Sequence, residues 1–161
     1  LKWRSLKDLP GSKTPLVALG WAASASVLPV IGSWDIFSPG LVIGFIFAAG
    51  MVFWRTALSD LLDIQGDRIV GRETIPIIIG VKDTRKILVA LLATLGGLLV
   101  IAAMLGWIPR VGYLLLVTIF AYVLCFLVYK RRHLVNRLYF EGIMDANFLL
   151  AGIMCMIYGI N

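Results

Sequence analysis

Histidine and cysteine are almost missing from this chain of 161 residues, which contains one His and two Cys. His133 stands in a basic loop with no second His or Cys near it, so the spacing does not indicate a zinc site. Cys125 and Cys155 both fall inside apolar stretches, where a thiol usually serves packing and not a disulfide. A metal site in this chain would therefore be built from oxygen ligands.

Charge is scarce as well: 15% of the residues are charged and 60% are hydrophobic, and the mean hydropathy is +0.94. A soluble domain of this length has too much surface to be so apolar, which indicates that the chain lies in lipid. Five apolar stretches are long enough, or nearly so, to cross about 30 Å of hydrocarbon as helices. These stretches are 16–34, 41–59, 87–108, 112–129 and 143–160. We predict an all-α polytopic transmembrane bundle, with residues 1–161 in a single transmembrane domain.

The first residues, LKWRSLKDLPGSK, are basic and are broken by Pro10 and Gly11, which indicates a loop. They lack the charged, apolar and cleavage regions of a signal peptide. Because the chain starts at Leu1 with such a loop, we expect it to be the later part of a longer membrane protein.

The basic residues are distributed unevenly about the five stretches. Alternating spans place the N-terminal segment and the loops 60–86 and 130–142 on one side of the membrane. Of the 15 Lys and Arg residues, all except Arg110 fall on that side or at a span end facing it. The positive-inside rule makes this side cytoplasmic, so we expect a multi-pass integral membrane protein, in the inner membrane if it is bacterial. In this setting the net charge of +6 indicates contact with anionic lipid headgroups and not with nucleic acid.

Three carboxylates directly follow the second apolar stretch, in the sequence SDLLDIQGDRIVGRETIP at residues 59–76. If the helix continues through residue 67, Asp60, Asp63 and Asp67 lie within an arc of about 60° on one face. Like charges repel there, the negative end of the helix dipole adds to the repulsion, and the membrane edge adds a desolvation cost. A positive charge must compensate the three acids.

Two sources of positive charge are open. Arg68 and Arg72 follow the acids at once and would form ordinary salt bridges in a cytoplasmic loop. Alternatively, the acids bind divalent cations; oxygen ligands alone favour a hard ion such as Mg2+, which commonly bridges carboxylates to substrate phosphates. The two arginines would then hold the remaining phosphate oxygens, because a guanidinium matches a phosphate bidentately. Gly66 permits a close approach and Gly71 permits a turn.

The run DLLDIQGDR at residues 60–68, followed by GRETIP at 71–76 and by Gly80, closely resembles the second aspartate-rich motif of the UbiA superfamily of intramembrane prenyltransferases. The resemblance includes the basic segment LKDLPGSK and the three apolar stretches after the motif, so it covers essentially the whole chain. Superfamily members have nine transmembrane helices and two such motifs, the first of the form NDxxDxxxD, which this sequence lacks. The resemblance implies that the chain supplies five of nine helices and that the isolated chain is inactive.

This resemblance also implies an activity, namely Mg2+-dependent transfer of an isoprenoid chain from its diphosphate to a small-molecule acceptor. The implied metal ligands are Asp60, Asp63 and Asp67, and Asp63 and Asp67 are the expected catalytic residues. The residues expected to bind the diphosphate are Lys13, Arg68 and Arg72. An aromatic quinone precursor such as 4-hydroxybenzoate is the expected acceptor; chlorophyllide, haem, glycerophospholipid and sugar-phosphate acceptors also occur in the superfamily.

Two other functions are weighed against this one. A CDP-alcohol phosphotransferase also mounts acids at a membrane edge, but its Asp-Gly and Ala-Arg pairs between two acidic pairs are not found in DLLDIQGDRIVGRE. A cation transporter would need acids well inside its spans, whereas these acids lie at one edge beside arginines. Asp145 and Asn147 are predicted to begin the last span, where Asp145 serves as a helix cap or lines a pocket.

Overall fold

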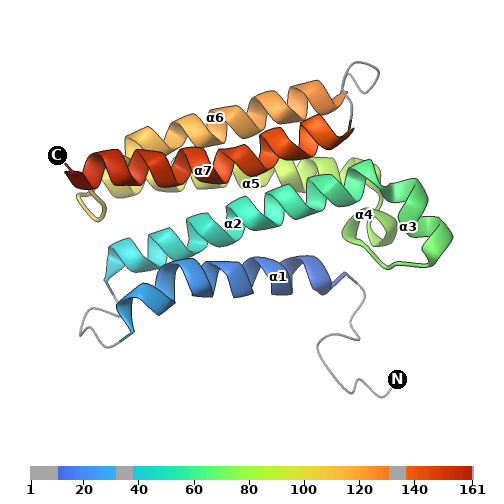
Figure 1. Cartoon of the computed structure of the whole chain (residues 1–161), viewed down its shortest axis with the longest axis horizontal. Helices are drawn as coiled ribbons and strands as arrows, with labels where there is room; N and C mark the ends of the chain where they lie inside the picture. Colours follow the sequence, from blue (N-terminus) through green and yellow to red (C-terminus); the bar gives the residue numbers. More distant parts are fainter. Residues whose placement is uncertain (1–10, 32–37, 131–136, 161) are drawn as a thin grey trace. The chain divides into compact units, whose positions relative to one another are not determined.

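The computed structural model describes residues 11–31, 38–130 and 137–160, which are mostly helical and contain no β-strand (Figure 1). The described α-helices are α1 (Lys13–Ala22), α2 (Pro39–Leu62), α3 (Ile64–Val70), α4 (Ile75–Ile78), α5 (Val81–Met104), α6 (Val111–Lys130) and α7 (Arg137–Ile160). The predicted all-α class is confirmed. The basic loop around His133 and the segment 1–10 lie outside the described residues.

Four of the described helices are long and apolar enough to cross a membrane. They are Pro39–Leu62, Val81–Met104, Val111–Tyr129 and Tyr139–Tyr158, and they correspond to the last four predicted stretches. The helix at Val81 begins six residues before its predicted stretch, which starts at residue 87. The polar residues of its first turn, including Lys82 and Asp83, are helical, although they lower the mean hydropathy of the segment. Apolar runs therefore underestimate the length of these helices.

The first predicted stretch is helical but changes its geometry along its length. The α-helix α1 ends at Ala22, a π-helical turn covers Ala23–Val27, and a 3-10 turn covers Leu28–Val30. Pro29 has no backbone N–H and cannot continue an α-helical hydrogen-bond ladder, which accounts for the change near its end. The predicted stretch 16–34 is therefore helical through Val30 but is not one continuous α-helix, and its residues 32–34 lie outside the described part.

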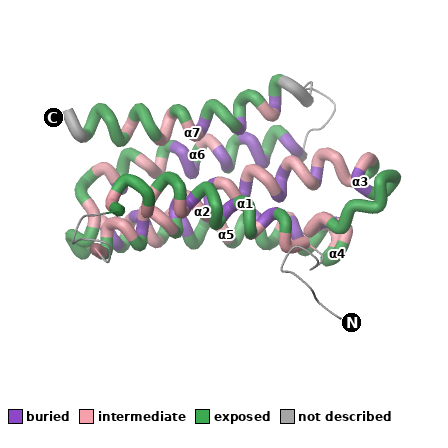
Figure 2. The backbone as a smooth tube through the Cα atoms, turned by 60° about the horizontal axis from the view of Figure 1, so that its bottom comes forward, coloured by how far each residue is buried: buried purple, intermediate pink, exposed green. Residues whose placement is uncertain are grey.

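The chain forms two compact units, Leu1–Leu91 and Leu92–Asn161, which divide inside α5. In the first unit α1 packs along α2, and α3 and α4 lie where α2 ends and α1 begins (Figure 1). Figure 2 colours buried residues purple; they recur along α2 from Ile43 to Leu61 and include Met51, Trp54, Leu58 and Leu61. Their spacing of three and four residues is that of one helix face. The single domain remains a prediction.

In the second unit α6 and α7 pack side by side. The buried Asn147 of α7 donates from Nδ2 to the carbonyl oxygen of Thr118 in α6 at 2.9 Å, and Thr118 Oγ1 donates to the carbonyl of Leu115. The prediction that Asp145 and Asn147 begin the last span is wrong, because α7 starts at Arg137. Asp145 lies two turns inside the helix, so it does not cap it. The early start escaped prediction because residues 137–142 are more polar than the stretch that follows.

Candidate active site

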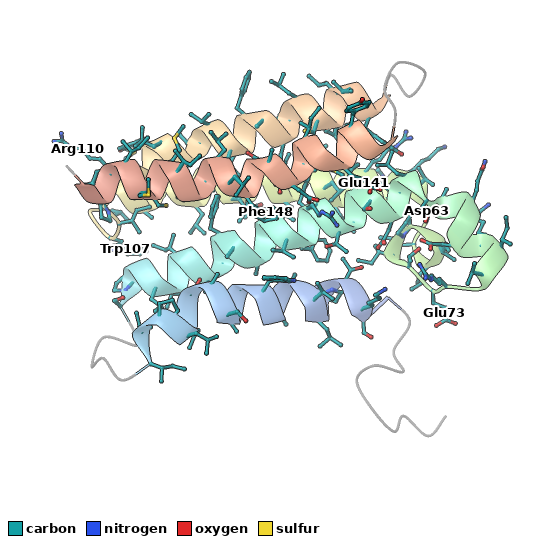
Figure 3. All side chains as sticks on the ribbon, viewed as in Figure 1. Asp63, Glu73, Trp107, Arg110, Glu141 and Phe148 are labelled. Atoms are coloured by element: carbon teal, nitrogen blue, oxygen red, sulfur yellow. The ribbon has the colours of Figure 1, made fainter. Side chains whose placement is uncertain are left out.

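The acidic motif begins at a break between two helices. α2 ends at Leu62, Asp63 has φ −103° and ψ 14°, and α3 begins at Ile64. The condition under which the three acids would share one helix face, a helix that continues through residue 67, is therefore not met. Two hydrogen bonds still bridge the break: Asp63 N donates to Ser59 O, and Asp67 N donates to Asp63 O. Asp is a weak helix former whose side chain competes for backbone groups, which fits a break at this position, labelled in Figure 3.

Asp60 lies in the last turn of α2 and is held from a second helix. Its Oδ2 accepts a hydrogen bond of 3.0 Å from the hydroxyl of Thr14, which lies 46 residues earlier in the first turn of α1. Thr14 is only 3% exposed and Asp60 is half-buried, so this bond is partly buried. The neighbouring backbone is tied to the motif as well, since Gly11 N donates to Glu73 O at 2.9 Å. The start of α1 therefore contacts the motif at two points.

Asp67 and Arg72 are brought together by the way in which α3 ends. Gly71 adopts the left-handed conformation, with φ 72° and ψ 28°, and Arg72 N donates to Asp67 O at 2.9 Å. This is the Schellman arrangement, in which glycine reverses the chain after the last helical turn. The reversal returns the Arg72 side chain to Asp67, and Nη1 lies 3.5 Å from Oδ1. Asp67 is 4% exposed while the Arg72 side chain is 60% exposed.

A cavity of about 730 Å³ opens between the start of α1, the end of α2 and the segment 71–74. Its charged lining residues are Lys13, Asp60, Asp67, Arg72 and Glu73. Leu16 and Val17 of α1 form part of an apolar wall. The volume is that of a typical small-molecule site, and one cavity thus combines acids, bases and an apolar surface.

Two of the predicted site residues lie elsewhere. Asp63 and Arg68 do not line this cavity, and Arg68 is exposed on the last turn of α3. The Asp63 carboxylate lies over Gly66 instead: a Cβ atom at Gly66 would come within 2.7 Å of Asp63 Oδ1. The structure therefore brings Asp60, Asp67, Lys13 and Arg72 together and leaves Asp63 and Arg68 outside the cavity.

The comparison with known families agrees with this motif. The model of the UbiA prenyltransferase family matches residues 11–151, which cover most of both units and the whole cavity. The chain belongs to the UbiA prenyltransferase family. The resemblance read from the aspartate-rich motif is thereby confirmed.

A curated relative within the superfamily is a digeranylgeranylglyceryl phosphate synthase from Haloquadratum walsbyi (strain DSM 16790 / HBSQ001). It is 32% identical over 105 residues, which cover 65% of this chain and 34% of the relative. The match thus spans about a third of the relative's length. No solved structure matches the chain.

The net charge of the residues that line the cavity is compatible with a bound cation. Three acids and two bases line the cavity, so its lining carries a formal charge of −1. Asp60 and Asp67 line the same cavity, where ionised carboxylates repel each other and the positive charges of Lys13 and Arg72 oppose that repulsion. The described residues contain no cluster of three or more acids, His or Cys with a metal-binding geometry. Two carboxylates suffice for Mg2+, which keeps several waters and takes its other ligands from a substrate phosphate. Asp60 and Asp67 therefore fit Mg2+ in a site where a substrate phosphate would supply further ligands.

Sequence reasoning missed two contributors to this site, Thr14 and Glu73. Thr14 follows Lys13 directly, but no spacing rule connects it to an acid 46 residues later. Glu73 was quoted only as part of the run GRETIP and was given no role. Its backbone carbonyl accepts a hydrogen bond from Gly11 N, and Glu73 lines the cavity. A weak signal existed for Thr14. A hydroxyl in a helix interior usually donates to the carbonyl four residues earlier, but in the first turn no helical carbonyl stands at that position, so the hydroxyl can bond elsewhere.

Proposed function

We propose that the intact protein containing this chain is a Mg2+-dependent membrane prenyltransferase. The observation that carries the proposal is the cavity in which Asp60 and Asp67 face the same space as Lys13 and Arg72, in a member of the UbiA family. The four apolar helices support placement of this site at the edge of a bilayer. The positive-inside pattern of the sequence supports the cytoplasmic side.

Asp60 and Asp67 are the residues that would hold Mg2+, because their carboxylates line the cavity and oppose each other electrostatically. When bound, the ion neutralises the diphosphate and makes it a better leaving group. A lining with a formal charge of −1 repels a diphosphate anion, so donor binding requires this added positive charge. Asp63 remains a predicted third ligand, which would require its carboxylate to move away from Gly66.

Lys13 and Arg72 would bind the diphosphate from the two sides of the cavity. Lys13 comes from the start of α1 and Arg72 from the turn after α3. The Arg72 side chain is 60% exposed although it lies beside the buried Asp67, so its remaining donors are accessible to a ligand. Leu16 and Val17 provide an apolar surface next to these charges, as an isoprenoid chain with a charged end requires. Arg68 remains a predicted contact outside the cavity.

The proposed reaction breaks the bond between C1 of the isoprenoid and the bridging diphosphate oxygen. The electron pair of that bond leaves with the diphosphate, which Lys13 and Arg72 stabilise as its charge develops. A nucleophilic atom of the acceptor forms the new bond to C1 and then loses a proton. Water must be excluded, because it would compete with the acceptor for the electron-poor carbon.

Two classes of acceptor are tested separately. The motif resemblance led us to expect an aromatic quinone precursor such as 4-hydroxybenzoate. A glyceryl phosphate acceptor is the second candidate, because the relative from Haloquadratum walsbyi is a digeranylgeranylglyceryl phosphate synthase. Incubation of the intact protein with labelled geranylgeranyl diphosphate and each acceptor in turn distinguishes them by the mass of the product.

The proposed function is tested by the thermal stability of the purified intact protein in detergent. We expect an increase in Tm that requires Mg2+ and an isoprenoid diphosphate together, and that disappears in Asp60→Asn and Asp67→Asn. The rival CDP-alcohol phosphotransferase predicts stabilisation by a CDP-alcohol, and a cation transporter predicts stabilisation by a cation without diphosphate. Either of those results, without a response to isoprenoid diphosphates of several chain lengths, contradicts the proposal.

A further inference from the structure

We propose that Thr14 is a positioning residue for the Asp60 carboxylate in Mg2+ and diphosphate binding. The inference rests on the function proposed above and adds a residue to that site. Thr14 Oγ1 donates to Asp60 Oδ2 at 3.0 Å, and the two residues come from different helices. The bond occupies one carboxylate oxygen and leaves Oδ1 for a ligand.

The position of Thr14 within its helix makes this bond possible. A hydroxyl in a helix interior usually donates to the carbonyl four residues earlier. Thr56 of α2 does this, since its Oγ1 donates to Val52 O at 2.8 Å. Thr14 is the second residue of α1, so no helical carbonyl precedes it and its hydroxyl is available to Asp60. Both threonines line the same cavity, but only Thr14 bonds to an acid of the motif.

The hydrogen bond from Thr14 restrains the Asp60 carboxylate against electrostatic repulsion. Asp60 and Asp67 line the same cavity, where two ionised carboxylates repel each other, and an unrestrained Asp60 side chain would turn away from Asp67. The Thr14 hydroxyl opposes that rotation, because breaking the bond would leave the hydroxyl of a buried residue without its acceptor. Thr14 itself is 3% exposed, and the Gly11 N to Glu73 O bond fixes the backbone just before it. The start of α1 therefore holds Asp60 in a cavity-facing orientation before any ligand binds.

Groups that orient metal-binding residues typically change metal affinity by about 10- to 100-fold when removed. We therefore expect Thr14→Val in the intact protein to raise the Mg2+ concentration for half-maximal stabilisation by at least about 10-fold. The probe is a Tm titration with Mg2+ at a fixed concentration of inorganic pyrophosphate. Thr14→Ser restores the hydroxyl and should return the midpoint to within about twofold of the original protein, since it restores the same donor.

Thr56→Val is the matched control, because it makes the same chemical change at the same cavity. Its hydroxyl is committed to its own helix, so the Mg2+ midpoint should change by less than about twofold. The Tm without ligand is recorded for every variant, and a purely structural role of Thr14 would change that Tm alone. If Thr14→Val does not fold, Thr14→Ala removes the hydroxyl without the branched side chain and takes its place in the titration.

Two results overturn the inference and are distinguishable. If Thr14→Val keeps the original Mg2+ midpoint while Asp60→Asn abolishes the stabilisation, Thr14 does not position Asp60, and the proposed function stands. If Asp60→Asn itself responds to Mg2+ and pyrophosphate like the original protein, the metal site is not at Asp60. That second result removes both the proposed site and this inference.

Discussion

The two units of the chain each bury a polar side chain to the same extent, but in different company. Asp67 of the first unit is 4% exposed and Asn147 of the second is 3% exposed. Asp67 lies beside an exposed arginine and lines a cavity that holds two further acids. Asn147 donates to a backbone carbonyl of the adjacent helix α6. By burial alone, Asp67 and Asn147 would be equally strong candidates for a functional role.

The difference lies in what each side chain can still do. A neutral amide bonded to a helix carbonyl joins two membrane helices, which is a common use of polar residues in lipid. A buried carboxylate is more costly to keep in place, and such a group is retained where charge is needed. The comparison therefore predicts that substitutions in the first unit affect ligand binding and turnover, whereas a substitution at Asn147 affects stability.

The largest expected effect is that of Asp67→Asn. The substitution keeps the size of the side chain and removes its charge, so it separates metal binding from packing. We expect prenyl transfer by the intact protein to fall by at least roughly 100-fold, the scale on which removal of one electrostatic group from an active site is felt. The measurement is product formation at saturating Mg2+, and its control is the Tm without ligand. Turnover within about threefold of the original protein would contradict a role for Asp67 in catalysis.

Arg72→Ala should mainly weaken binding of the isoprenoid diphosphate. Charged hydrogen bonds contribute about 1.5–3 kcal/mol, which corresponds to a rise in the donor KM of at least about 10-fold. Lys13→Ala should act in the same direction, since Lys13 lines the same cavity with a second positive charge. Arg68→Ala is the comparison variant, because Arg68 is a predicted diphosphate contact that is exposed and does not line the cavity, and we expect a smaller rise in KM for it. An equal rise in KM for Arg68→Ala would show that the diphosphate reaches beyond the described cavity.

Gly66→Ala tests whether Asp63 takes part without altering Asp63 itself. The added methyl group would meet Asp63 Oδ1 at 2.7 Å, and the carboxylate is the mobile end of a side chain, so the carboxylate should move. Alanine is also a better helix former than glycine by up to about 1 kcal/mol, so the fold should tolerate the change. If Asp63 binds metal, activity falls several-fold and the Mg2+ midpoint of the Tm titration shifts. If Asp63 serves only as the residue that precedes α3, the activity and the Mg2+ midpoint stay unchanged. Both should then also stay unchanged in Asp63→Asn.

Much of the fold could be predicted from the sequence because hydropathy and helix length are local properties. The last four spans follow from apolar runs. Gly71 indicates a turn, and α3 ends directly before it. The interruption near Pro29 is visible in the sequence as well, since proline cannot continue an α-helical hydrogen-bond ladder. The early start of α7 at Arg137 was hidden by polar residues that are helical all the same.

The candidate site was predicted in its residue types but not in its geometry. Asp60, Asp67, Lys13 and Arg72 were expected and do share a cavity. Ideal helix geometry placed Asp63 beside Asp60 and Asp67, and it failed because the helix breaks at Asp63 itself. The contact between Thr14 and Asp60 joins two helices and depends on how they pack, which no local pattern encodes.

The smallest expected effect, on the other side of the comparison, is that of Asn147→Leu. The substitution removes the hydrogen bond to Thr118 O, and hydrogen bonds between membrane helices contribute about 0.6 kcal/mol on average. It also removes Oδ1, which is buried and accepts no hydrogen bond from any described residue, so part of the loss is offset. We therefore expect a decrease of less than about 1 kcal/mol in the free energy of unfolding in detergent, with kcat/KM unchanged. Asn147→Asp should destabilise the protein more, because it places a carboxylate against the same carbonyl oxygen. A loss of donor binding in Asn147→Leu would instead connect the second unit to the site and end the contrast between the two buried residues.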